Sequence, residues 1–229
     1  MRRVLQEASL LFTRDYQVCG EDTMTREFIP ALSWKGLTPL FDFLSSIVGL
    51  GKGYRQKIVQ ALPIKEGDHI MDAGCGTGSL AIELKRKHQH VQVYGVDADE
   101  QILAIARKKS ANVEIEYKQA FLQELPFKDN YFDSVVSSLV FHHLTSQAKQ
   151  DSMKEIYRVL KKSGRFLLVD FGKPRNRLFA LFSWFSVLFE EGRDNYEGRI
   201  PRMLSDAGFK NIKEIAQYRF NIAFMEAIK

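Results

Sequence analysis

Three glycines fall within five residues in the stretch "DAGCGTG", which runs from Asp72 to Gly78 and follows an apolar run. Because glycine has no Cβ, such a loop can turn tightly and bring its backbone against a ligand. A dinucleotide-binding loop would carry its third glycine at position 79, where this chain has Ser79, and a phosphate-binding loop would continue into Gly-Lys-Ser/Thr, which does not follow. The remaining pattern favours a ligand with a bulky sugar and a charged tail, whose ammonium group Asp72 could hold.

A second acid, Asp97, ends the β-rich run "VQVYGVD", nineteen residues after Gly78. A carboxylate at the end of the second strand of an open α/β sheet can accept hydrogen bonds from both hydroxyls of a ribose. Together the loop and Asp97 predict a site for a nucleoside with a cationic tail.

From residue 64 onward, strand-like and helix-like segments alternate along the sequence. These elements would position the residues named above. Short β-rich runs near Ile70, ending at Asp97, and beginning at Val113, Phe132 and Arg165 are separated by patterns with helical spacing. This alternation is typical of βαβ units in a doubly wound, mainly parallel sheet. We expect Asp99 and Ser146 to cap the second and third helices and Gly164 to close the third.

The two ends of the chain differ from this pattern. "NIKEIAQYRF" and "NIAFMEAIK" follow a helix that Gly208 should stop, and two successive strands predict an antiparallel pair at or near the sheet edge. Residues 1–60 read mainly as helical segments, so we expect an N-terminal helical cap on a domain that spans 61–229. An aromatic insertion at 174–191 interrupts the alternation.

The ordered segments "MDAGCGTG", "VYGVDAD", "LPFKDNYFDSVVSSLVFHHL" and "EIYRVLKKSGRFLLVDFGKP" resemble the class I S-adenosylmethionine-dependent methyltransferases. "LPF", "YRVLKKSGR" and "DFGKP" are most similar to the group that includes the ubiquinone/menaquinone biosynthesis methyltransferases. The resemblance covers about residues 64–229. It implies a Rossmann-like, seven-stranded sheet with an antiparallel last strand and S-adenosylmethionine as cofactor, with S-adenosylhomocysteine as product.

The resemblance also implies roles for individual residues. Asp72 and the glycine loop would line the methionine part of the cofactor, Asp97 would bind the ribose, and Ala98 would lie beside the adenine. The acid that contacts the adenine in many relatives is missing here, where Gln119 and Ala120 stand, so Phe121 and Leu122 would supply stacking and backbone contacts instead. Ser138 would face the reactive methyl group. The expected cofactor-binding set is Asp72, Gly74, Gly76, Thr77, Gly78, Asp97, Ala98, Phe121, Leu122 and Ser138.

His142 and His143 follow the fourth strand, at the mouth where acceptor and methyl group would meet. A phenol or an activated carbon must lose a proton on methylation, and histidine is the side chain suited to this near neutral pH. One of the pair is therefore a candidate general base or acceptor ligand. The alternative is that both belong to a structural turn. We expect no metal site.

Composition limits the partners and the compartment. The net charge of +5 is too small to imply nucleic acid, and the basic residues are scattered in short groups. Two cysteines, Cys19 and Cys75, with the second inside the glycine loop, favour a reducing cytoplasm. The apolar run at 178–189 is shorter than the roughly 20 residues that a spanning helix needs. It would cover the acceptor, lie at a membrane surface, or pack in a core or homodimer interface.

The sequence thus predicts a methyltransferase that acts on a small, hydrophobic or aromatic acceptor, which includes lipid-like molecules, by C- or O-methylation. Two alternatives stay open at this stage. One is a phospholipid or amine N-methyltransferase, and the other is a cofactor-binding protein without transferase activity.

Overall fold

A computed structural model describes residues 50–173 and 192–229 of the chain. Its elements in order are α3 (Lys52–Ala61), β1 (His69–Ala73), α4 (Ser79–Lys87), β2 (Gln92–Asp97), α5 (Glu100–Lys109), β3 (Glu116–Gln119), β4 (Phe132–Ser138), the 3₁₀ turn η2 (Phe141–His143), α6 (Ser146–Val159), β5 (Leu160–Phe171), α8 (Arg193–Glu197), α9 (Ile200–Asp206), β6 (Lys210–Tyr218), the 3₁₀ turn η4 (Arg219–Asn221) and β7 (Ile222–Ile228).

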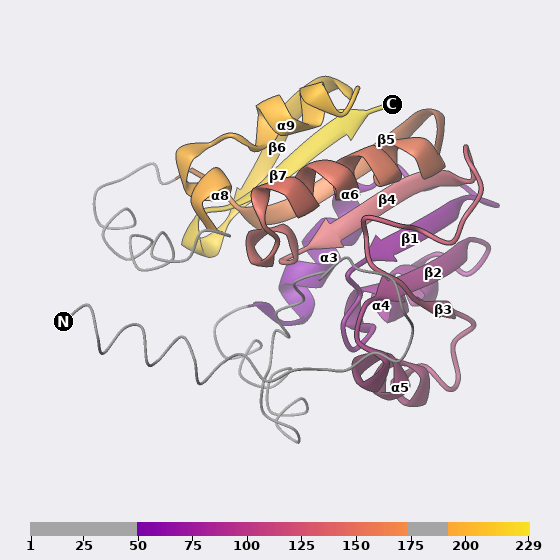
Figure 1. Cartoon of the computed structure of the whole chain (residues 1–229). Coiled ribbons are helices and arrows are strands. Elements are labelled where there is room, and N and C mark those ends of the chain that lie inside the picture. Colours follow the sequence, from indigo (N-terminus) through magenta and orange to yellow (C-terminus); the bar gives the residue numbers. More distant parts are fainter. Residues whose placement is uncertain (1–49, 174–191) are drawn as a thin grey trace, which may run out of the picture.

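The described strands form one sheet in the order β3-β2-β1-β4-β5-β7-β6 (Figure 1). Strands β1 to β5 pair in parallel, whereas β7 pairs antiparallel with both β5 and β6. The predicted doubly wound sheet with an antiparallel last strand is therefore confirmed. The chain moves outward from β1 to β3 and then crosses to β4 on the other side of β1. The carboxyl ends of β1 and β4 thus mark the switch point of the strand order, the place where such sheets bind ligands.

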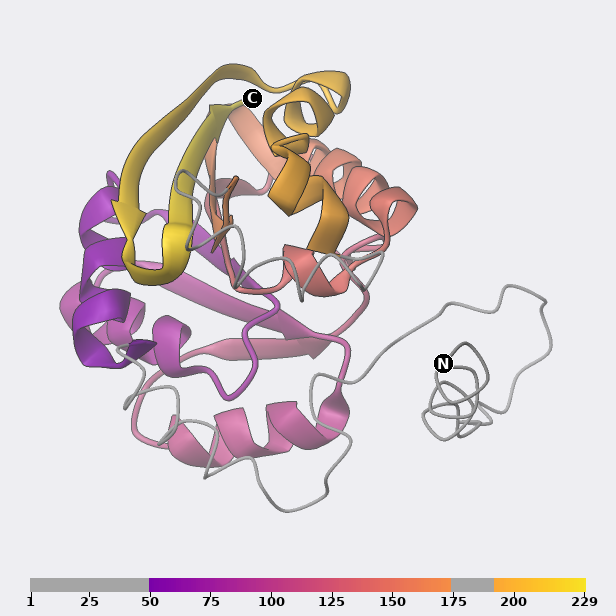
Figure 2. The same cartoon turned by 90° about the vertical axis from the view of Figure 1, so that its left-hand side faces the viewer.

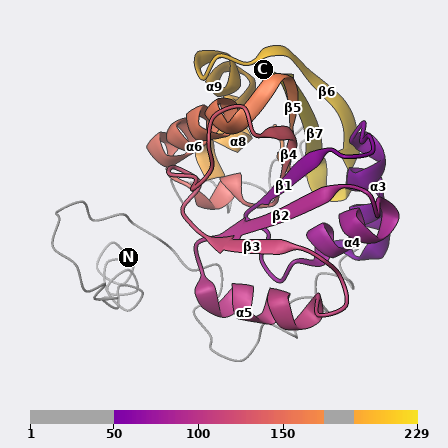
Figure 3. The same ribbon diagram turned by 90° about the vertical axis from the view of Figure 1, so that its right-hand side faces the viewer.

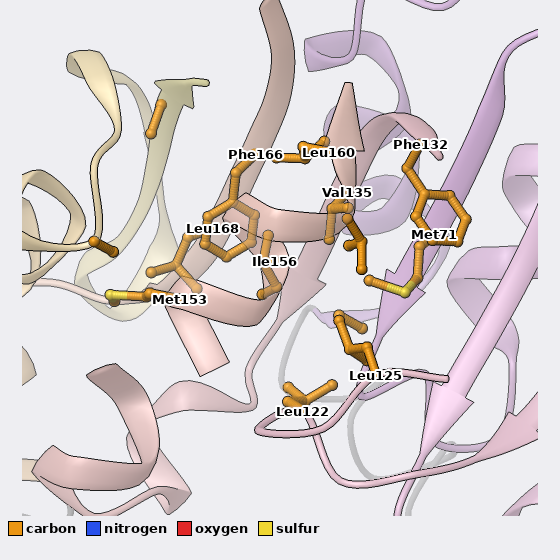
Figure 4. Close-up of a cluster of buried hydrophobic side chains, with 14 of the residues drawn as sticks. Met71, Leu122, Leu125, Phe132, Val135, Met153, Ile156, Leu160, Phe166 and Leu168 are labelled. Atoms are coloured by element: carbon orange, nitrogen blue, oxygen red, sulfur yellow. The ribbon is translucent and has the colours of Figure 1, made fainter. Parts of the chain in front are cut away.

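Helices cover both faces of the sheet, with α3 and α4 on one side and α6 and α9 on the other (Figures 2 and 3). Strand β5 shows why both faces are apolar. Phe166 and Leu168 point into the α6–α9 layer, while Leu167 and Val169 point into the α3–α4 layer, as the two-residue period of a strand requires. Figure 4 shows part of the first core, in which Phe166 and Leu168 lie beside residues of α6.

Two predicted helix boundaries are wrong. Helix α6 is capped by Thr145, whose hydroxyl accepts a hydrogen bond from the Ala148 N–H, and Ser146 is the first helical residue. Gly164 does not close this helix, which ends at Val159; it lies inside β5. A Cβ there would lie 2.8 Å from the Lys161 carbonyl oxygen, so Gly164 serves the irregular start of β5 instead. Asp99 caps α5 as predicted.

The predictions for the remaining N-terminal segments and for the aromatic insertion at 174–191 fall outside the described residues. Of the expected helical cap, the structure describes α3, whose buried Tyr54, Ile58 and Val59 pack in the core of the main sheet. The domain boundary at residue 60 stays a prediction.

Candidate functional site

The glycine loop crosses the carboxyl end of β1 in a conformation that favours glycine. Gly74, Gly76 and Gly78 have φ angles of 77°, 53° and 73°, in the left-handed region that residues with a Cβ seldom adopt. The N–H groups of Gly74 and Cys75 both donate to the Val96 carbonyl, at 2.8 and 2.9 Å. These bonds fix the loop against the end of β2.

The three glycines make room for different neighbours. A Cβ at Gly74 would collide with the Val140 side chain, and one at Gly78 with the Tyr117 hydroxyl, so both positions are limited by protein packing. A Cβ at Gly76 would meet no atom of the described residues within 4 Å. The space beside Gly76 is therefore the part of the loop that is free to receive a ligand.

Thr77, also expected in the site, is buried, and its hydroxyl is already engaged. It is 3.3 Å from the Ser79 hydroxyl and accepts from the Lys109 ammonium at 3.4 Å. Lys109 also donates to Ser79 at 2.5 Å, which ties the end of α5 to the start of α4. The Thr77 side chain therefore stabilises the loop, and its contact with a cofactor stays a prediction.

Asp72 carries the clearest signal for a missing cationic partner. Its side chain is 2% exposed, and Oδ2 is buried without a hydrogen-bond partner among residues 50–173 and 192–229. Burial raises the pKa of this carboxyl to about 7, against a hydrogen bond from the Ala81 N–H, and the nearby Asp97 raises it further. An unpaired buried carboxylate oxygen is costly, whereas an ammonium group beside it would satisfy it.

Asp97 stands at the end of β2, facing the loop. Its Oδ2 accepts from the Gly76 N–H at 2.9 Å and its Oδ1 from the Asp99 N–H at 3.1 Å. Each carboxylate oxygen keeps a second acceptor position, so ribose hydroxyls can still be bound. Burial raises the pKa of Asp97, and the two N–H donors oppose that effect.

The residues expected around the adenine lie next to Asp97. The Gln119 side chain donates to the Ala98 carbonyl at 3.0 Å, so this glutamine holds the backbone where relatives would have an acid. Leu122 is 6% exposed and packs into the core in Figure 4, while Phe121 is half-buried. The Phe121 side chain can therefore stack on a base, whereas Leu122 can contact a base only through its backbone.

The end of β4 brings together two hydroxyls that are far apart in the sequence. Ser138, expected to face the methyl group, lies 2.9 Å from the hydroxyl of Tyr54 on α3. Tyr54 is 3% exposed, and burial raises its pKa well above the ordinary value. It therefore stays protonated and orients the Ser138 hydroxyl at the carboxyl end of β4.

His142 is paired with Asp170, a residue at the end of β5. Its Nδ1 lies 2.7 Å from Asp170 Oδ1, and its backbone N–H donates to Asp170 Oδ2 at 3.2 Å. Burial would raise the pKa of Asp170, but the His142 ring and hydrogen bonds that include the Phe171 N–H hold it below the usual value. An ionised Asp170 keeps the proton on Nδ1 and leaves the lone pair on Nε2 for an incoming proton.

His143 has a different environment. Its ring centroid lies 3.9 Å from that of His142, and burial, together with His142, lowers its pKa to about 4. It has no carboxylate partner of its own among the described residues. Of the two histidines that the sequence pointed to, His142 is thus the one that an acid orients.

Sequence reasoning missed Asp170 and Tyr54. Asp170 lies near the end of a predicted strand, beside the strand that the two histidines follow, so its position could have been noticed. Nothing local marks Tyr54, because its partner Ser138 is 84 residues away.

Comparisons with known proteins identify the family of the chain. Residues 71–168 match the family model described as a methyltransferase domain. The chain is 30% identical over 203 residues to a demethylmenaquinone methyltransferase of Lactobacillus johnsonii, an alignment that covers 77% of this chain and 82% of the relative. The chain belongs to the class I S-adenosylmethionine-dependent methyltransferases.

Two further comparisons support this assignment. The methyltransferase is 30% identical over 157 residues to a 2-phytyl-1,4-naphtoquinone methyltransferase of Trichormus variabilis, with 65% of this chain and 68% of the relative covered. Its fold matches the crystal structure of a proposed S-adenosylmethionine-dependent methyltransferase of Methanococcus maripaludis, with a TM-score of 0.66, 20% identity, and 92% and 97% of the two chains covered. The protein is therefore an enzyme with S-adenosylmethionine as cofactor, and the non-catalytic alternative loses its support.

The site fits this cofactor on its own geometry. The unpaired Oδ2 of Asp72 suits the ammonium group of the methionine part. Gly76, beside which the space is open, stands between Asp72 and Asp97 in the sequence. S-adenosylmethionine supplies a methyl carbon that its sulfonium makes electrophilic. The chain's residues must therefore align the acceptor with that carbon, exclude water, and take up a proton.

We predict that the affinity for S-adenosylmethionine falls as the pH drops below the pKa of Asp72. Below about 7 this carboxyl is protonated in the free enzyme, so binding the ammonium must release a proton. The dissociation constant should rise roughly fivefold from about pH 7 to about pH 6. Calorimetry on Asp72→Asn should show weak binding with this dependence gone; an unchanged pH dependence in the variant would contradict the assignment.

Proposed function

We propose that the enzyme transfers a methyl group to a ring carbon of a reduced naphthoquinone that carries an apolar tail. The observation that carries this proposal is the His142–Asp170 pair at the carboxyl ends of β4 and β5. Two relatives named for naphthoquinone-type acceptors support the choice of ring. The phospholipid or amine N-methyltransferase reading has no comparable support, because an amine acceptor needs no ring proton removed.

The reduced, hydroquinone form is the reactive acceptor in this proposal. A quinone ring carbon is electron-poor, whereas loss of a hydroquinone O–H proton makes the adjacent ring carbon nucleophilic. His142 Nε2 would take that proton, and S-adenosylmethionine, when bound, would supply the methyl group to the ring carbon and keep the electron pair of the broken carbon–sulfur bond. His142 would then return its proton to the ring oxygen and take the hydrogen of the methylated ring carbon as a proton, so that the aromatic ring is restored and one proton is released in total.

Apolar and polar contacts for such a ring are present at the same edge. Phe171 is 38% exposed, and its ring lies edge-on to His142 with centroids 4.8 Å apart. An exposed aromatic beside a base suits a flat ring, since aromatic pairs favour such edge-on and offset contacts. The Ser138 hydroxyl, held by Tyr54, would bind an acceptor oxygen.

Turnover with a short-tailed demethylmenaquinol tests the proposal. The enzyme should convert S-adenosylmethionine to S-adenosylhomocysteine only when the acceptor is kept reduced with dithionite, and should be inactive with the oxidised quinone. Turnover of phosphoethanolamine but not of the quinol would refute it.

We predict that Tyr54→Phe lowers kcat about tenfold and leaves the affinity for S-adenosylhomocysteine unchanged. The substitution removes only the hydroxyl that orients Ser138, which acts on the acceptor. Tyr131→Phe is the matched control, because it removes a 2.6 Å hydrogen bond to Tyr94 that lies outside the site. Equal losses of kcat in both variants would mean that Tyr54 serves stability alone.

Other expected partners remain predictions. The expected membrane contact through 178–189 falls outside the described residues. The expected homodimer stays a prediction. Among residues 50–173 and 192–229, no helix is long and apolar enough to cross a membrane.

A further inference from the structure

A basic groove of about 610 Å³ runs between α3 and α4 on the outer side of their layer. Figure 3 shows the two helices side by side on the sheet face that they cover. Four cations line the groove, Lys52 and Arg55 from α3 and Arg86 and Lys87 from α4, together with one acid, Glu83, and two glutamines. We call it the α3–α4 groove.

The charges of the groove are not balanced within the described part of the chain. No ion pair there engages any of the four cations. Three of them, Lys52, Arg86 and Lys87, are exposed, and Arg55 is half-buried. Cations that crowd one groove repel each other, so an anionic partner with several charges is the ligand that this surface fits.

The position of the groove points to a membrane rather than to a free anion. Helix α3 carries Lys52 and Arg55 on its groove side and, between them, Tyr54, whose hydroxyl holds Ser138 at the end of β4. The α3 end of the groove therefore lies one helix away from the acceptor end of the sheet, and Arg86 and Lys87, at the end of α4, extend the groove toward the opposite end. On the proposed function, the acceptor carries an apolar tail and resides in that membrane.

We propose that the α3–α4 groove binds anionic lipid head groups and holds the enzyme at the membrane from which a lipid-tailed acceptor reaches Ser138 and His142. This inference rests on the proposed function for its purpose, but the binding itself does not depend on the acceptor. Each basic residue near an anionic membrane strengthens binding about fivefold, so removing four should weaken it by roughly a hundredfold or more.

The test is co-sedimentation of the full chain with vesicles of phosphatidylcholine, with and without phosphatidylglycerol. The groove variant changes Lys52, Arg55, Arg86 and Lys87 to Gln, which lowers the net charge from +5 to +1. The matched control changes four exposed lysines outside the groove, Lys108, Lys162, Lys210 and Lys213, to Gln and reaches the same net charge. Unchanged affinity for S-adenosylhomocysteine shows that each variant is folded.

We expect the unmodified enzyme and the control to bind the phosphatidylglycerol vesicles and the groove variant to lose that binding. Equal losses in both variants would overturn the proposal, since net charge alone would then explain the attraction. Binding of duplex DNA, rather than vesicles, that is lost only in the groove variant would overturn it too.

A failure of the proposed function would give a different result in these experiments from a failure of the groove assignment. If the groove variant loses vesicle binding while no quinol is a substrate, the groove assignment stands and the acceptor is wrong. If both proposals hold, the groove variant methylates a short-tailed soluble quinol normally and a long-tailed quinol in vesicles poorly.

Discussion

His142→Ala is expected to lower kcat by about 10²–10⁴, the range that a positioned general base contributes. Asp170→Asn should lower it by a similar order, because an uncharged amide no longer holds the proton on Nδ1 and no longer stabilises the protonated ring. Both are measured as initial rates with saturating S-adenosylmethionine and quinol. The affinity for S-adenosylhomocysteine should be unchanged, since neither side chain belongs to the glycine loop.

The control for this prediction is His90→Ala, a histidine whose side chain is 76% exposed and whose contact with Glu66 lies on the surface. It should leave kcat as it is. A wild-type rate in His142→Ala would show that the histidine pair is the structural turn that the sequence left open. It would also remove the base from the proposed mechanism.

Gly76→Leu is expected to abolish measurable binding of S-adenosylmethionine, a loss of at least about a hundredfold in affinity. A Cβ at Gly76 meets no atom within 4 Å in the part of the chain that the structure describes, so the leucine side chain occupies the space left for the ligand without a clash there. The positive φ of 53° adds strain on the order of 1–2 kcal/mol. Calorimetry with S-adenosylmethionine and S-adenosylhomocysteine measures the loss.

Gly67→Leu separates the effect on the ligand from the backbone strain. Gly67 also has a positive φ, 82°, and no atom within 4 Å of a Cβ, but it lies in the turn before β1, at the opposite end of the strand from the loop. Both variants should lose similar stability on heating, and only Gly76→Leu should lose the cofactor. Normal cofactor affinity in Gly76→Leu would refute the loop assignment.

The sheet could be predicted because each strand has a recognisable local sequence pattern. Successive side chains of β5 point into apolar layers on opposite faces of the sheet, so its sequence is a continuous apolar run. Such a run, when it stands between two helical patterns, is typical of a buried parallel strand. The glycine loop and Asp97 could be predicted for the same reason, since their spacing along the chain fixes their places at the ends of β1 and β2.

The errors came from features that only tertiary structure decides. Thr145 and Ser146 are both suitable caps, and the extended backbone of Thr145 selects it. The polar start of β5 reads as the end of a helix, yet Ser163 has a positive φ of 63° and bonds to the carbonyl of Lys229 at the other end of the chain. Tyr54 and Asp170 were missed because their roles depend on partners that lie far away in the sequence.

The most direct test of the central claim is to locate the transferred methyl group. The enzyme is incubated with S-adenosylmethionine labelled with ¹³C in its methyl group and a reduced, short-tailed demethylmenaquinone, and the product is examined by NMR. The account predicts a labelled methyl group on a ring carbon, formed by the wild type and strongly reduced in His142→Ala. A label on a ring oxygen, or a product formed equally well without His142, would contradict it.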